Sequence, residues 1–313
     1  MEDVAFSVVY VTNRKDPKIA WFVDSFMREL DGDLAGIEVL VVAYFEDAVR
    51  EAVKKAGAES WITVHPPKPN VWQGEHKLTK KDWFAAANAR NTGIALSRGH
   101  TIVFVDDLSA VVPGWWEWAK HACRNQCVCL GTYEKVRDLA VDSSGALTYD
   151  EAPNSCGKDT RLPMLPQPAE DTKAYPAVGG WLYGSSVACP IEFLLVINGF
   201  DEECNGIGTE DYIAGLMLDH MEFPLFICPG MKTVEDDKMH YVEKPFPRLN
   251  RGEGETDSAW TILKKVQGAE RVVAPNVDNL RDLRDKVLAG EPFPIPTKPD
   301  KFWYDETPLK ELP

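Results

Sequence analysis

The sequence predicts an α/β fold in which helices flank a mostly parallel central sheet. Strand-like and helix-like segments alternate over the first 65 residues, and a buried-strand pattern at 101–105 runs into two adjacent carboxylates. The chain has 313 residues and no internal repeat, which is enough for one large hydrophobic core. Alternation of strands and helices favours parallel strands joined by crossover helices. A Rossmann-like sheet is therefore expected.

The first five elements follow from hydrophobic periodicity. Strands are expected at 4–11, 37–43 and 61–65, and helices at 18–30 and 47–56. The glycine-rich fingerprint of dinucleotide-binding proteins is missing after the first strand, where Thr12, Asn13 and Arg14 stand instead. This pattern argues against a classical dehydrogenase.

A helix rich in Ala and Leu is expected at 85–98, and Gly99 supplies a stop before the strand at 101–105. That strand ends at Asp106 and Asp107. Open α/β sheets bind ligands outside the carboxyl ends of their strands, and carboxylates there can hold a hard divalent ion. The competing interpretation is that the two acids open a turn and cap the segment that follows.

A second group of motifs lies far along the chain. Gly179, Gly180 and Trp181 precede the segment "NGFDE" at 198–202, and Glu210 and Asp211 open a helix expected over 213–218. Trp181 is a candidate for stacking against a sugar ring, whereas Trp115 and Trp118 are expected in the core. Acids in the first turn of a helix also occur as caps, because they complement its dipole.

Together these segments resemble family 2 glycosyltransferases of the GT-A fold. In that family an "ARNxG" helix precedes a strand that ends in Asp-x-Asp, and a "GGFDE" turn precedes an "ED" pair that opens a helix. The resemblance covers residues 4–240 and implies one catalytic domain at 1–245. Its nucleotide-sugar half ends near 110, and its acceptor half, 111–245, contains a proline-rich loop at 142–178. A C-terminal extension, 246–313, would hold a helix over 277–288 and an extended proline-rich tail.

The resemblance implies inverting, metal-dependent transfer of a sugar from a nucleotide-diphosphate sugar to an acceptor hydroxyl. It makes Asp211 the general base, with Glu210 beside it. It assigns Mn²⁺ or Mg²⁺ to Asp106, Asp107 and His240, although the second Asp of the family motif falls on Leu108. The residues expected to contact the nucleotide sugar are Thr12, Asn13, Arg14, Asp47, Arg90, Asn91, Asp106, Gly180 and Trp181. Ala43 stands where the family has an acid that contacts uracil, and Glu46 or Asp47 could replace it.

Other functions fit parts of the same pattern. A nucleotidyltransferase would share the sheet and the carboxylates, but it normally has a glycine-rich basic loop after the first strand. A non-catalytic sugar or nucleotide binder would explain Leu108 as a lost metal ligand. The acceptor could be a glycan, a small molecule or a hydroxymethylated DNA base, and the formal charge of −15 disfavours nucleic acid.

The chain has neither a run of 18 apolar residues nor an N-terminal signal pattern, so a soluble, cytoplasmic protein without membrane insertion is expected. Its seven cysteines are an odd number and are expected to be reduced. His121 lies near Cys123, Cys127 and Cys129, whose C-x3-C-x-C spacing matches no common zinc pattern. We expect alternate cysteines to face opposite sides of a strand at 128–133, which disfavours a zinc site.

Overall fold

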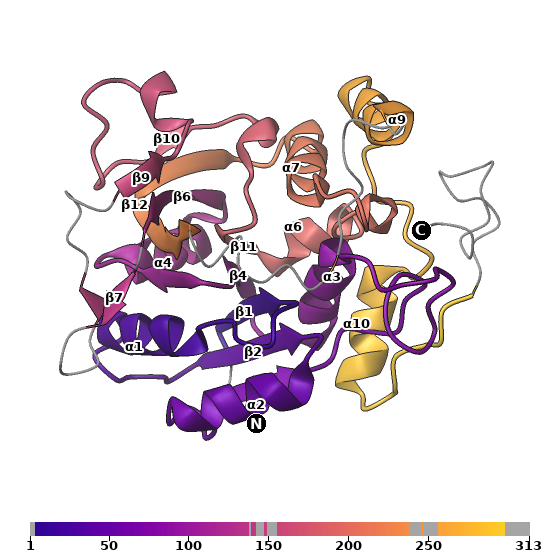
Figure 1. Cartoon of the computed structure of the whole chain (residues 1–313). Coiled ribbons are helices and arrows are strands. Elements are labelled where there is room, and N and C mark those ends of the chain that lie inside the picture. The colour runs from indigo at the N-terminus through magenta and orange to yellow at the C-terminus, as the bar shows by residue number, and fades with distance from the viewer. Residues whose placement is uncertain are drawn as a thin grey trace.

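The computed structural model describes residues 4–137, 139–141, 147–148, 155–237, 246 and 256–297. Its centre is a ten-stranded sheet whose main path runs β10-β12-β6-β11-β4-β1-β2-β3, while β5 pairs with β12 and β9 with β6 (Figure 1). The strands are β1 (Phe6–Thr12), β2 (Ile37–Ala43), β3 (Ile62–His65), β4 (Thr101–Asp106), β5 (Ser109–Val111), β6 (Val128–Val136), β9 (Ser155–Lys158), β10 (Tyr175–Pro176), β11 (Ser186–Pro190) and β12 (Leu225–Asp236). A separate pair is formed by β7 (Ala140–Val141) and β8 (Leu147–Thr148).

The sheet is mixed. Strands β3, β2, β1 and β4 are parallel neighbours, and β12 is parallel to β6. Strand β11 runs antiparallel to both β4 and β6 and joins the two parts. The predicted fold class, an α/β sheet flanked by helices, is confirmed.

Helices cover both faces of the sheet, and each face has its own apolar layer. One layer holds α1 (Ile19–Glu29), α2 (Glu46–Lys55) and α4 (Trp115–Asn125). The other holds α3 (Ala86–Leu96), α6 (Ile191–Val196), α7 (Glu210–His220), α9 (Thr256–Gln267) and α10 (Leu280–Leu288). Short 3-10 turns, η1 (Leu162–Met164), η2 (Gly179–Trp181) and η3 (Glu202–Cys204), lie between the main elements. Successive residues of a strand alternate between the two layers, as Val8 and Val9 do.

The C-terminal segments depart from the sequence expectation. Helix α9 was not predicted, and α10 begins three residues later than expected because the Asn279 side chain accepts a hydrogen bond from the Asp282 backbone N–H and caps it. Leu280 and Leu283 are buried in the same apolar layer as α3, so α10 packs on the main domain. Within the described part of 142–178 the chain forms β8, β9, η1 and β10. No helix among the described residues is long and apolar enough to cross a membrane.

Candidate functional site

A cavity of about 720 Å³ lies at the carboxyl ends of β1, β2 and β4 and is the candidate site. Strand β1 lies between the other two, with Thr12 opposite Ala43 and Val11 opposite Asp106, so the residues that follow each strand meet at one edge. The cavity is lined by Val11, Thr12, Asn13, Arg14, Tyr44, Pro67, Gln73, Lys81, Phe84, Ala85, Ala86, Ala89, Arg90, Asp106, Asp107, Gly208, Thr209, Glu210, Asp211, Glu235 and Phe246.

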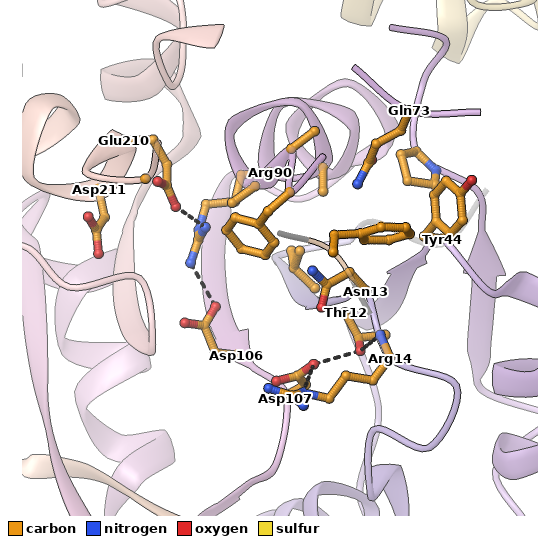
Figure 2. A pocket seen from close by; sticks show the side chains of 18 of the residues that line it. Thr12, Asn13, Arg14, Tyr44, Gln73, Arg90, Asp106, Asp107, Glu210 and Asp211 are labelled. Atoms are coloured by element: carbon orange, nitrogen blue, oxygen red, sulfur yellow. Dashed lines mark hydrogen bonds and ion pairs between the residues drawn. The ribbon is translucent and has the colours of Figure 1, made fainter. Parts of the chain in front are cut away.

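Arg90 links the β4 side of the cavity to the α7 side. It projects from α3, and its Nη2 donates to Asp106 Oδ1 at 2.7 Å while its Nη1 donates to Glu210 Oε1 at 2.7 Å. Figure 2 shows the guanidinium between these two carboxylates, with Asp211 beside Glu210. The Arg90 side chain is 5% exposed and lies over the Phe200 ring. Two ion pairs thus fix the strand end of β4 to the start of α7.

Asp107 belongs to a second network on the other side of the cavity. Its Oδ2 accepts from the Thr12 hydroxyl at 2.7 Å and lies 3.1 Å from Arg14 Nε (Figure 2). Burial raises the pKa of Asp107 to about 6, against the opposing effect of the Arg14 guanidinium. The carboxylate therefore holds the loop after β1 in place.

Leu108 occupies the position of the second family Asp. Its side chain is 1% exposed, and its backbone is left-handed with φ of 61°. The Leu108 N–H donates to the Pro17 carbonyl, and its own carbonyl accepts from Asp236 N–H. Position 108 therefore points into the core, so a carboxylate there would not face the cavity in this backbone conformation.

Asp211 lies half-buried in the first turn of α7. Its Oδ2 accepts from Gly184 N–H at 3.1 Å, and its Oδ1 accepts from Tyr212 N–H at 2.8 Å. The preceding Thr209 is left-handed with φ of 72°, which is costly for a β-branched residue. Such strained residues gather at functional sites, because the surrounding structure must hold them there. The carboxylate of Asp211 is thus held in a fixed orientation at the cavity.

The sequence did not predict several of the lining residues, among them Tyr44, Gln73 and Glu235. Tyr44 directly follows β2, one residue after Ala43, and its ring packs edge-on against Phe246 at 4.6 Å between centroids. Gln73 lies near Tyr44 in Figure 2, on a segment without regular structure. Glu235 comes from β12, and burial, together with the nearby Asp106, raises its pKa to about 8. Tyr44 could have been found by the rule that located Asp106, since both stand at the carboxyl ends of parallel strands.

Comparison with solved structures identifies the architecture. The structure of S. aureus TarS with UDP-GlcNAc matches with a TM-score of 0.57 and 13% identity, over 92% of this chain and 71% of that one. GalNAc-T7 with UDP, GalNAc and Mn²⁺ matches with a TM-score of 0.52 and 12% identity, over 93% and 59% of the two chains. These proteins are glycosyltransferases of the GT-A fold. The present chain has a GT-A fold.

The sequence itself gives no closer relative. No protein-family model and no curated protein matches it. In another structure of S. aureus TarS, which matches with a TM-score of 0.53, the chain spans 42% of that protein's length. At 12–13% identity the likeness establishes the GT-A fold, and the activity has to be argued from the site.

Four residues expected at the nucleotide sugar lie outside this cavity of the GT-A fold. Asp47 is exposed in the first turn of α2. Asn91 is buried, and its amide binds the backbone of Phe200 and a carboxylate oxygen of Glu202, so it anchors the segment "NGFDE". Gly180 and Trp181 form η2, whose turn packs against α7. His240 lies outside the described residues.

The charge of the cavity bears on whether a cation fits. Five carboxylates and three basic side chains occur among its described lining residues, which gives a formal charge of −2 when all are ionised and −1 at neutral pH, where the raised pKa of Glu235 keeps it mostly protonated. Asp106 is the carboxylate of the family motif that reaches solvent, with 40% of its side chain exposed, whereas Asp107 is 14% exposed. Oxygen ligands and an excess of negative charge suit Mg²⁺ or Mn²⁺. The donor set therefore fits such an ion, with Asp106 facing it.

Proposed function

We propose that this protein is an inverting glycosyltransferase that moves a sugar from a nucleotide-diphosphate sugar to an acceptor hydroxyl. The observation that carries the proposal is the placement of Asp106 and Asp211 at one cavity of a GT-A fold, with Arg90 pairing Asp106 to Glu210, the neighbour of Asp211. The structures it resembles contain UDP-GlcNAc or UDP. A cavity of about 720 Å³ is in the range of small-molecule sites.

The nucleotide is proposed to lie along the ends of β1 and β2. Thr12, Asn13 and Arg14 form the loop after β1, and Tyr44 offers an aromatic face next to the Gln73 amide. Aromatic rings stack on any nucleobase, and amides can bind its edge. In this placement the side chains of Asn13 and Gln73 select the nucleobase, because no acidic residue directly follows β2.

The cation is proposed to be held by Asp106, with Asp107 and His240 as the further ligands that the resemblance implies. When bound, Mn²⁺ or Mg²⁺ neutralises charge that develops on the departing diphosphate. Arg90 keeps the Asp106 carboxylate directed at the cavity. Glu210 acts through Arg90 and is a positioning residue, because its own carboxylate is 7% exposed and paired with the guanidinium.

Asp211 is proposed to accept the proton of the acceptor hydroxyl as that oxygen attacks the anomeric carbon. Attack from the face opposite the diphosphate inverts the configuration of the sugar. Backbone N–H groups of Gly184 and Tyr212 hold both carboxylate oxygens in place, which provides the fixed geometry that general base catalysis needs. The acceptor is a glycan, a small molecule or a modified DNA base.

A non-catalytic nucleotide-sugar binder is the second candidate. It is favoured by Leu108 and by the arginine partners of both acids in the β4 turn, since these arginines already balance the two carboxylates. In such a protein the cavity would bind the donor without a cation and without turnover.

A donor screen separates the two candidates. Thermal unfolding is measured with a panel of nucleotide sugars, each with and without Mn²⁺, because a ligand at 100 times its Kd stabilises the fold by about 2.7 kcal/mol. A donor that stabilises the protein in a Mn²⁺-dependent way and slowly releases nucleoside diphosphate supports the transferase. Stabilisation that needs no metal, without any release, supports the binder. If no nucleotide sugar stabilises the protein, both proposals fail.

A further inference from the structure

A second group of side chains, none of which lines the cavity, has the chemistry of a metal site. The ligand atoms of His121, Cys127 and Cys129 all lie within 4.8 Å of one another. His121 stands in the last turns of α4, Cys127 follows the left-handed Gln126, and Cys129 is the second residue of β6. The expectation that the sulfurs face opposite sides was wrong, because residues two apart in an extended segment share a face.

We propose that His121, Cys127 and Cys129 bind a structural Zn²⁺ ion. The sulfurs of Cys127 and Cys129 are 3.9 Å apart. Zn–S bonds of about 2.3 Å at tetrahedral angles place two sulfurs about 3.8 Å apart. The two thiols are therefore already spaced as two corners of a zinc tetrahedron, and the ring nitrogen of His121 is within reach of a third.

Charge favours the same ion. Cys127 and Cys129 are 1% and 0% exposed, in the apolar layer beneath α4. When Zn²⁺ binds, each thiol loses its proton to solvent, and two thiolates with a neutral imidazole balance the two positive charges. A neutral complex is far cheaper to bury than a free ion. Soft sulfur ligands also select zinc over the hard ions suited to the carboxylate cavity.

A further thiol lies within the same layer. Cys228, on the neighbouring strand β12, is buried in this layer with Cys127 and Cys129, and its thiol donates to the Phe226 carbonyl. Cys189 is also buried near Cys129, but it belongs to the apolar layer on the opposite face of the sheet. Cys228 therefore shares the face of the sheet with the proposed ligands, but its sulfur lies outside the group of three ligand atoms that are within 4.8 Å of one another. The ion would tie the end of α4 to β6, next to the strand that carries Glu235.

The full-length chain, purified with a reductant, is loaded with one equivalent of Zn²⁺, desalted and analysed for metal. One zinc per chain is expected, and loading with Co²⁺ should give the charge-transfer absorption of a thiolate–cobalt bond. His121→Ala and Cys127→Ser should each lower zinc affinity more than about tenfold. Even the loss of a residue that only hydrogen-bonds to a metal ligand lowers affinity by about that factor. Cys189→Ser is the matched control, equally buried, and should keep the ion.

If Cys127→Ser does not fold, the zinc affinity of His121→Ala tests the proposal, because His121 is half-buried and its replacement leaves the core intact. The proposal is overturned if the wild-type chain retains no zinc. It is also overturned if Cys189→Ser loses the ion as readily as His121→Ala, or if mass spectrometry shows a Cys127–Cys129 disulfide in the reduced preparation.

Discussion

Replacement of Arg90 by methionine should destabilise the protein by about 3–5 kcal/mol, because it removes the guanidinium that pairs with a buried carboxylate. Nearly all of this cost comes from Glu210, whose side chain is 7% exposed and whose Oε1 lies 2.7 Å from Arg90 Nη1. The pair with Asp106 has the same length, but the Asp106 side chain is 40% exposed, so water screens it and its share is about 0–1 kcal/mol. A domain stable by about 5–15 kcal/mol would still fold.

The assay is urea unfolding at neutral pH for Arg90→Met, Glu210→Gln and the double variant. If loss of the guanidinium beside the Glu210 charge is the source of the destabilisation, the double variant should be more stable than Arg90→Met alone. Arg28→Met is the control, because Arg28 pairs with Asp24 at an exposed site and should cost about 0.3–0.5 kcal/mol. A cost for Arg90→Met as small as that of the control, or losses that simply add in the double variant, would refute the assigned role of Glu210.

Four further predictions test the site. Asp211→Asn should retain nucleotide-sugar binding by calorimetry and lose transfer by more than about 100-fold, and unaltered transfer would remove Asp211 as the base. Tyr44→Ala should weaken nucleoside diphosphate binding by about 1–3 kcal/mol through lost stacking, and unchanged affinity would place the base elsewhere. Asn91→Ala should lower the free energy of unfolding by about 1–3 kcal/mol, because the buried Phe200 N–H loses its acceptor, although the Phe200 carbonyl keeps the Asn276 amide. Glu235 has a pKa of about 8 against an ordinary 4.5, so it binds a proton more tightly when folded. The stability that comes from this tighter proton binding is fully present below pH 4.5 and is lost as the pH rises through 8. The free energy of unfolding of Glu235→Gln, measured in urea, should therefore rise relative to that of the wild type over this interval and then level off. A difference independent of pH would show that Glu235 does not titrate in this way.

The limits of the sequence are visible within a single helix. Arg90 and Asn91 stood as equal candidates, because both are polar and adjacent in the "ARN" segment. Successive helical residues point about 100° apart. The packing of α3 therefore directs Arg90 to the cavity and Asn91 to the backbone of Phe200. Which polar residue meets a ligand depends on the helix orientation, which local sequence does not encode.

Periodicity and strand-end chemistry were enough to place the elements and the acids. The strands at 37–43 and 101–106, the parallel order of the first half and the carboxylates at the mouth of the sheet all follow from local patterns, because side-chain alternation and chain reach are local properties. Tertiary structure decided what those patterns left open. It joined Arg90 to Glu210 across 120 positions, brought Glu235 to the cavity from β12, and gathered His121 with two thiols beneath α4. These contacts depend on how strands and helices pack, and their partners are separated by elements whose relative positions no short motif specifies.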